Sequence, residues 1–183
     1  MEQLAHEAGL EVPKPTPAAA EASLAPYRAS ETLSDLVGAS PQPLHGTQVR
    51  LANIESPNDA GPTTTAPFAF NYAVKSTEFS ATNAYRHVNW CFNLVKGMGF
   101  SLASYFDGTT FPVQVDHWSL GGSGTVNAHC PDDAEGNGVG HFCFASAQSG
   151  QTVGIADDLR VVLHEFGHAL LWDHVASPNF GFA

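Results

Sequence analysis

The stretch VVLHEFGHALLWDH, residues 161–174, constrains the fold more strongly than any other part of the 183-residue sequence. It belongs to a predicted helix that runs from about residue 155 to at least residue 172. Asp157 and Asp158 fall at its N-terminal end, where the helix dipole favours negative charge. Five apolar residues supply its packing surface: Val162, Leu163, Phe166, Ala169 and Leu170.

Two histidines four residues apart lie one turn apart on the same helix face, so His164 and His168 can bind one ion. Zinc accepts histidine nitrogens at about 2.0–2.1 Å and, in catalytic sites, keeps a position for water, whose pKa it lowers toward ~7. Glu165 is placed to act as general base on that water. Burying these polar groups among apolar neighbours is costly without a metal or partner, which favours a zinc site over an ordinary helix.

A third protein ligand is harder to assign. The pattern H-E-x-x-H-x-x-G-x-x-H uses a third histidine after a glycine that turns the chain, but here Leu171 stands at that glycine position. In an unbroken helix His174 lies about 80° from the direction of His164 and ~15 Å along the axis. His174 is therefore predicted to be a helix-end residue. The alternative is a metzincin-like site, in which the helix breaks at Leu171 and His174 completes the ligands.

The other known ligand set adds an acidic residue from a later helix. The segment VASPNFGFA after His174 contains no Asp or Glu, so we expect this ligand downstream of residue 183. On this interpretation the chain is a truncated catalytic domain. The uncovered face of the helix then forms an apolar patch that a C-terminal half or a partner chain covers.

The remaining pattern predicts an α+β fold, with strands, a helix, strands and the last helix in that order. Residues 1–45 are rich in Pro, Ala and Ser and read as a linker or pro-segment with one short helix at 31–37, followed by a domain at 46–183. An apolar stripe predicts a helix at 80–100, capped by Ser80 or Thr82 and ended by Gly97 or Gly99. Predicted strands cover residues 47–54, 68–74, 111–118, 125–130 and 139–147.

Three further groups of residues are candidates for chemistry or cross-linking. Cys130 and Cys143 either form a disulfide or remain reduced core thiols, and Cys91 is expected to be buried in a helix. The loop that contains Asp132, Asp133, Glu135 and Asn137 is a possible calcium site, although a solvated acidic loop is favoured. His117, His129 and His141 are predicted to be sheet residues and not ligands, because no metal-ligand spacing links them.

Composition excludes several classes of partner. The net charge of −11 with seven basic residues argues against nucleic acid and anionic membranes, and no apolar run reaches the ~18 residues of a membrane span. The first residues lack the basic and apolar regions of a signal peptide. The low charge density nevertheless favours a secreted or extracellular protein, with polypeptide as its partner.

Three segments resemble gluzincin metallopeptidases of the thermolysin type, and among them the fungalysin-like secreted enzymes: TNAYRHVNWCFNLVKGMGF, GTVNAHCPDD and DDLRVVLHEFGHALL. The resemblance extends over about residues 77–172. It implies the N-terminal part of a zincin catalytic domain, ending shortly after HExxH, in which a mixed β-sheet packs on an upstream helix and the HExxH helix.

The activity implied by this resemblance is that of a zinc-dependent endopeptidase, with His164 and His168 as ligands and Glu165 as base. Asn127 and Ala128 then bind substrate by adding it as a strand. Calcium is a further cofactor that such enzymes often carry. The family's glutamate ligand and a later oxyanion-stabilising histidine have no counterpart here. A non-catalytic zincin-like module, used for binding or structure, is the remaining alternative.

Overall fold

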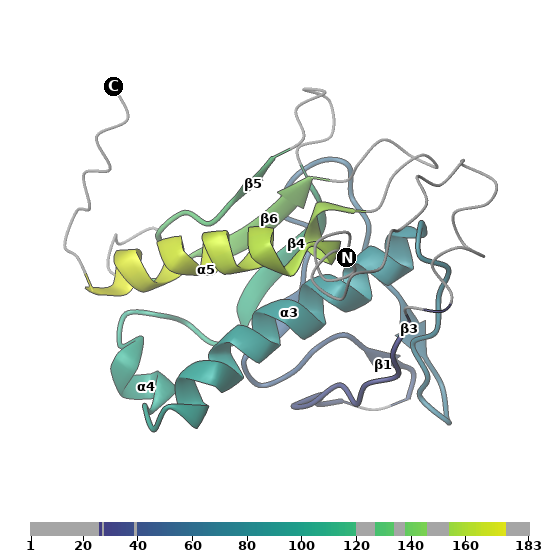
Figure 1. Ribbon diagram of the computed structural model, residues 1–183, viewed down its shortest axis with the longest axis horizontal. Helices are drawn as coiled ribbons and strands as arrows, with labels where there is room; N and C mark the ends of the chain where they lie inside the picture. Colours follow the sequence, from purple (N-terminus) through teal and green to yellow (C-terminus); the bar gives the residue numbers. More distant parts are fainter. Residues whose placement is uncertain are drawn as a thin grey trace.

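The computed structural model describes residues 26, 28–38, 40–119, 127–133, 138–145 and 154–174. These ranges contain α-helices and two β-sheets, which confirms the α+β class (Figure 1). The elements in chain order are β1 (Gln42–Pro43), β2 (Val49–Leu51), β3 (Thr63–Thr64), α3 (Thr77–Gly97), α4 (Leu102–Tyr105), β4 (Val113–Ser119), β5 (Ala128–His129), β6 (His141–Ala145), the 3₁₀ helix η2 (Ile155–Asp157) and α5 (Leu159–His174).

The main sheet is mixed and has the strand order β2-β4-β6-β5. Strands β2, β4 and β6 are parallel, whereas β5 runs antiparallel to β6 at one edge. β1 and β3 form a separate two-stranded antiparallel sheet. The antiparallel edge strand β5 lies beside α5, and this contact positions the candidate site.

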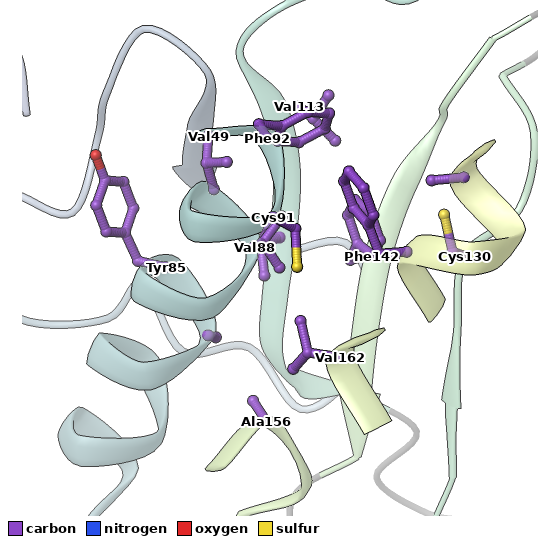
Figure 2. Packing of buried hydrophobic residues seen from close by; sticks show 14 of the residues in the cluster. Val49, Tyr85, Val88, Cys91, Phe92, Val113, Cys130, Phe142, Ala156 and Val162 are labelled. Carbon is purple, nitrogen blue, oxygen red and sulfur yellow. The ribbon is translucent and has the colours of Figure 1, made fainter. Parts of the chain in front are cut away.

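The core lies between one face of the main sheet and the two long helices. Because side chains alternate along a strand, Phe142 and Phe144 of β6 point into this core and His141 and Cys143 point away from it. The ring of Phe166 in α5 lies 5.1 Å from that of Phe92 in α3. Side chains from α3, β4, β6 and α5 meet in this core (Figure 2).

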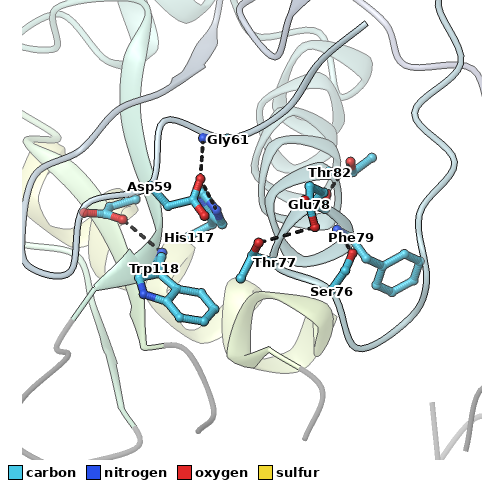
Figure 3. Close-up of polar contacts among 10 residues, drawn as sticks. Asp59, Gly61, Ser76, Thr77, Glu78, Phe79, Thr82, His117 and Trp118 are labelled. Atoms are coloured by element: carbon cyan, nitrogen blue, oxygen red, sulfur yellow. Dashed lines mark hydrogen bonds and ion pairs between the residues drawn. The ribbon is translucent and has the colours of Figure 1, made fainter. Parts of the chain in front are cut away.

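Helix α3 follows the apolar stripe that the sequence predicts, but it begins one turn earlier than expected. Ser76 is its N-cap, and its Oγ accepts a hydrogen bond from the Phe79 backbone N–H at 3.1 Å (Figure 3). Ser80 and Thr82 therefore lie inside the helix, and the prediction that one of them is the cap is wrong. Gly97 is the last helical residue, which confirms one of the two predicted helix ends, Gly97 and Gly99.

Helix α5 continues unbroken through Leu171 to His174. Its start is separated from η2 by Asp158, whose carboxylate accepts hydrogen bonds from the backbone and the guanidinium of Arg160. None of the helices in the described ranges has both the length and the apolar character that crossing a membrane requires.

Two predicted elements are absent from the described residues. Residues 31–37 are not helical, because Asp35 adopts a φ of 63° and its carboxylate accepts hydrogen bonds from Gln48, Asn89 and Asn93. Residues 68–74 form no strand, since Phe68 adopts a φ of 58° and is half exposed. In both segments, tertiary contacts or backbone conformation override the local pattern.

The segment before residue 46 also packs on the domain. Leu44 is buried in the core, and Arg86 of α3 forms an ion pair with Glu31 at 2.6 Å. The Tyr85 hydroxyl donates to the Ser34 carbonyl at 3.0 Å. Packing therefore continues across the domain boundary predicted at residue 45.

Helix η2 is attached to α3 by two polar contacts. The Asn83 amide donates to Asp157 Oδ1 at 2.6 Å, and His87 Nδ1 lies 3.0 Å from the Ala156 carbonyl oxygen. Burial raises the pKa of Asp157 to about 7, against the opposing effect of hydrogen bonds from Asn83 and the Gly154 backbone.

This raised pKa makes stability depend on pH. Between roughly pH 4 and pH 7 the unfolded chain has lost the Asp157 proton, while the folded protein retains it. Each unit by which the pH rises through this range therefore lowers the free energy of unfolding by about 1.4 kcal/mol. We expect the Asp157→Asn variant to lose this slope in urea unfolding measured at several pH values. Asp158→Asn is the control, because the pKa of Asp158 is lowered, chiefly by its hydrogen bond with Arg160. An unchanged slope in Asp157→Asn would contradict the assignment.

Candidate metal centre

The two histidines of the HExxH pattern converge on one point in space. Nε2 of His164 and Nε2 of His168 are 3.2 Å apart. Two nitrogens bound to one tetrahedral zinc ion at 2.0–2.1 Å would be about 3.3 Å apart. The observed distance between the two nitrogens, which also permits a hydrogen bond between the rings, is thus compatible with a shared zinc ion.

Only one of the three polar residues of the HExxH pattern is buried, whereas the sequence predicts burial of all three. His164 is exposed and His168 is half buried, whereas Glu165 is only 5% exposed. The prediction that both histidines are buried, and require a metal for that reason, is therefore wrong. They line an open surface, and what favours a shared ion is the short distance between their nitrogens.

Glu165 points toward the edge strand and is held there. The Cys130 backbone hydrogen-bonds to its carboxylate, and Trp172 Nε1 donates to the Cys130 carbonyl at 2.7 Å. Burial raises the pKa of Glu165, and the charges of His168 and His164 together with the Cys130 hydrogen bond oppose that rise. Helix α5 thus fixes both backbone polar groups of Cys130, and the edge strand in turn orients Glu165.

A pocket of about 770 Å³ lies over this part of α5. Its lining includes both histidines and Glu165 from the helix and Asn127 and Ala128 from the edge segment. The structure therefore brings together in one pocket the five residues that the sequence assigns to metal binding, base catalysis and substrate binding.

The hydrogen-bond pattern of β5 shows which backbone groups face this pocket. The Asn127 carbonyl accepts from the Ala145 N–H at 2.9 Å, and His129 is the register partner of Cys143. In an antiparallel ladder the intervening residue directs its backbone groups to the other side. The N–H and C=O of Ala128 therefore point to the open edge, in the direction in which Cys130 meets α5.

His174 lies apart from this pair. Its ring packs on Tyr105, with the centroids 4.3 Å apart, and its Nδ1 lies 3.5 Å from a carboxylate oxygen of Asp173. It is not among the residues that line the pocket. Because α5 is unbroken at Leu171, the chain does not make the turn that a metzincin-like third ligand requires.

Within the described parts of the chain, no third histidine, cysteine or acidic side chain joins His164 and His168 at ligand distance. The outer surface of α5 also carries Leu163 and Leu171, which are 41% and 39% exposed. A C-terminal half or partner chain that covers this surface remains a prediction.

The other candidate residues have simpler settings. Cys91, Cys130 and Cys143 are all free and buried, so the disulfide alternative is wrong and the reduced-thiol alternative holds. Asp132 pairs with Val139 across the acidic loop, whereas Glu135 and Asn137 lie outside the described residues.

His117, His129 and His141 lie in β4, β5 and β6, as predicted. His117 is buried, and its Nε2 lies 3.9 Å from Asp59 Oδ1 (Figure 3). His129 and His141 instead gather around Cys143, with ligand-type atoms within 4.8 Å of one another. Sequence spacing gives no sign of this cluster, because strand register creates it.

Comparison of the chain with protein-family models, curated proteins and solved structures found no significant match. The geometry of the pocket and the HExxH pattern are therefore the features of this chain that indicate a function.

Proposed function

We propose that this protein is a zinc-dependent endopeptidase of the gluzincin type. One observation carries the proposal: two imidazole nitrogens 3.2 Å apart lie beside a buried glutamate, in a pocket flanked by an antiparallel edge strand. A metal, a proton acceptor and an extended backbone are the components that peptide hydrolysis of this kind uses.

Each residue in the pocket has a distinct role in this proposal. His164 and His168 would hold a zinc ion, which would supply Lewis acidity toward a peptide carbonyl. Glu165 accepts a proton from the attacking water and delivers it to the leaving amine. Ala128 binds the peptide backbone through its outward N–H and C=O, so the substrate extends the sheet as a further strand.

Helix α5 and the edge strand keep these groups aligned. Trp172 and Glu165 both bind the Cys130 backbone, so the helix that carries the histidines also fixes the strand that would receive substrate. A short edge strand held in this way keeps a peptide in register with Glu165, which lowers the entropy cost of reaching the reactive geometry. Extracellular location and calcium binding remain predictions from composition and resemblance.

A non-catalytic zinc-binding module is the second candidate. It is favoured by the absence, within the described ranges, of a third protein ligand next to the histidine pair. The metzincin-like alternative has less support, because His174 packs against Tyr105. Peptide hydrolysis that depends on added zinc would exclude the module, and zinc binding without hydrolysis would favour it.

Zinc titration of single variants tests the metal site directly. We expect His164→Ala and His168→Ala each to weaken zinc binding at this site by at least tenfold, because each removes one of the two converging nitrogens. His174→Ala is the matched control on the same helix and should bind zinc like the parent chain. Equilibrium dialysis followed by elemental analysis measures all three.

Each result of this titration points to one assignment. If His174→Ala also loses zinc, the metzincin-like site is correct and the present assignment of ligands is wrong. If neither His164→Ala nor His168→Ala changes zinc binding, the HExxH pair is not a metal site and the proposed function fails.

A further inference from the structure

We propose a second transition-metal site, formed by His129, His141 and Cys143 on the face of the main sheet opposite α3 and α5. One ligand atom from each residue lies within 4.8 Å of the other two. The three come from two neighbouring strands, β5 and β6. None of its three residues belongs to α5, and only His129 also lines the pocket over the HExxH helix.

Strand register brings these side chains together. His129 and Cys143 are direct partners in the antiparallel pair β5–β6, so they project from the same face of the sheet. His141 precedes Cys143 by two residues and therefore projects from that face as well. Phe142, between them, projects into the core. The backbone thus fixes the cluster, and no flexible loop is needed to assemble it.

A carboxylate lies next to the cluster. Oε1 of Glu55 is 3.1 Å from Nε2 of His129. The segment that carries Glu55 is held by Asp116, whose Oδ2 accepts hydrogen bonds from the Ile54 and Glu55 N–H groups, each at 2.9 Å. Asp116 is itself fully buried in β4 beside Cys143. Glu55 is thus placed to orient the His129 ring, as carboxylates next to metal-bound histidines commonly do.

The donor set defines the class of metal. Two imidazoles and a thiolate favour zinc, or cobalt in its place, over magnesium and calcium, which bind oxygen ligands. Tetrahedral coordination needs these atoms about 3.3–3.7 Å apart, so side-chain rotation has to close the cluster by at most about 1.5 Å. His129 and His141 are not fully buried, which leaves a route for the ion.

A metal ion at this site would link strand β5 to strand β6. β5 contains only two residues, Ala128 and His129, and pairs with a single strand. An ion bound by His129 of β5 and by His141 and Cys143 of β6 would fasten this short strand to the sheet. Ala128, whose backbone faces the pocket, immediately precedes His129 in the chain. We therefore assign the second site a structural role, which is to hold the pocket edge in place.

Cobalt binding distinguishes the two sites, because only the second contains a thiolate. The test uses the metal-free full chain carrying His164→Ala and His168→Ala, to which Co²⁺ is added. We expect one bound cobalt and a near-ultraviolet absorption band from thiolate-to-cobalt charge transfer. Cys143→Ser should remove the band, and Glu55→Gln should weaken cobalt binding by about 10–100-fold.

Two further variants make the test decisive. Cys91→Ala, which removes a buried thiol from α3, should leave the band unchanged. His141→Gln alters a half-buried side chain and should weaken cobalt binding at least tenfold, so it serves if Cys143→Ser does not fold by circular dichroism. The proposal fails if the chain carrying only His164→Ala and His168→Ala shows no thiolate band. It also fails if the band survives in Cys143→Ser, or if His141→Gln binds cobalt as tightly as that chain.

Discussion

Replacement of Glu165 with glutamine is expected to lower the rate of peptide hydrolysis by about 10²–10⁴-fold, the range typical for loss of a general acid–base group. The glutamine amide keeps the shape of the side chain but cannot accept a proton from water. Zinc binding should persist, because the converging nitrogens belong to His164 and His168. Initial rates on casein at saturating zinc, together with zinc stoichiometry, measure the two effects separately.

Glu78→Gln is the matched control, since Glu78 is an exposed glutamate in the first turn of α3, away from the pocket. It should leave hydrolysis unchanged. Full activity of Glu165→Gln would show that another group is the base. Loss of zinc in the same variant would make Glu165 a ligand. If the parent chain binds zinc and hydrolyses nothing, the non-catalytic module is the better description.

The convergence of His164 and His168 is predictable because it depends only on local geometry. His164 and His168 are one helical turn apart, and the periodicity of their apolar neighbours is enough to predict that helix. The same holds for α3, whose buried residues follow the predicted stripe. Its start was misplaced by about one turn because several Ser and Thr residues can serve as a cap, and their sequence alone does not rank them.

Features that depend on distant partners could not be predicted in the same way. Asp35 leaves the helical region to accept hydrogen bonds from Asn89 and Asn93, which lie more than 50 residues later in the chain. Residues 68–74 are predicted as a strand, but a strand also needs a neighbour, and that segment pairs with none in the described sheets. Local pattern indicates which surface a segment can bury, and long-range contacts decide whether it does.

The cluster of His129, His141 and Cys143 also could not be predicted from local sequence. His129 and Cys143 are separated by 14 positions, a spacing typical of no familiar metal motif. They meet because β5 runs antiparallel to β6 in one particular register. A shift of one residue would turn His129 to the opposite face of the sheet. Its prediction therefore requires the strand pairing and not only the identity of the residues.

Replacement of Phe92 with alanine is expected to lower the free energy of unfolding by about 3–5 kcal/mol, the usual cost of deleting a buried aromatic ring. Phe92 is fully buried, and its ring meets those of Phe106, Phe111 and Phe166 at centroid distances of 5.3, 5.3 and 5.1 Å. The loss is large against the 5–15 kcal/mol of a typical domain. Urea unfolding followed by circular dichroism measures it.

The control is Leu94→Ala on the same helix, where the side chain is 44% exposed and the cost should stay below about 1 kcal/mol. Because Phe92 packs on Phe166 of α5, the cavity should also loosen the helix that carries His164 and His168. We therefore expect Phe92→Ala to bind zinc more weakly than Leu94→Ala even in the absence of urea. Equal zinc affinity in the two variants would show that α5 holds its histidines in place without support from α3.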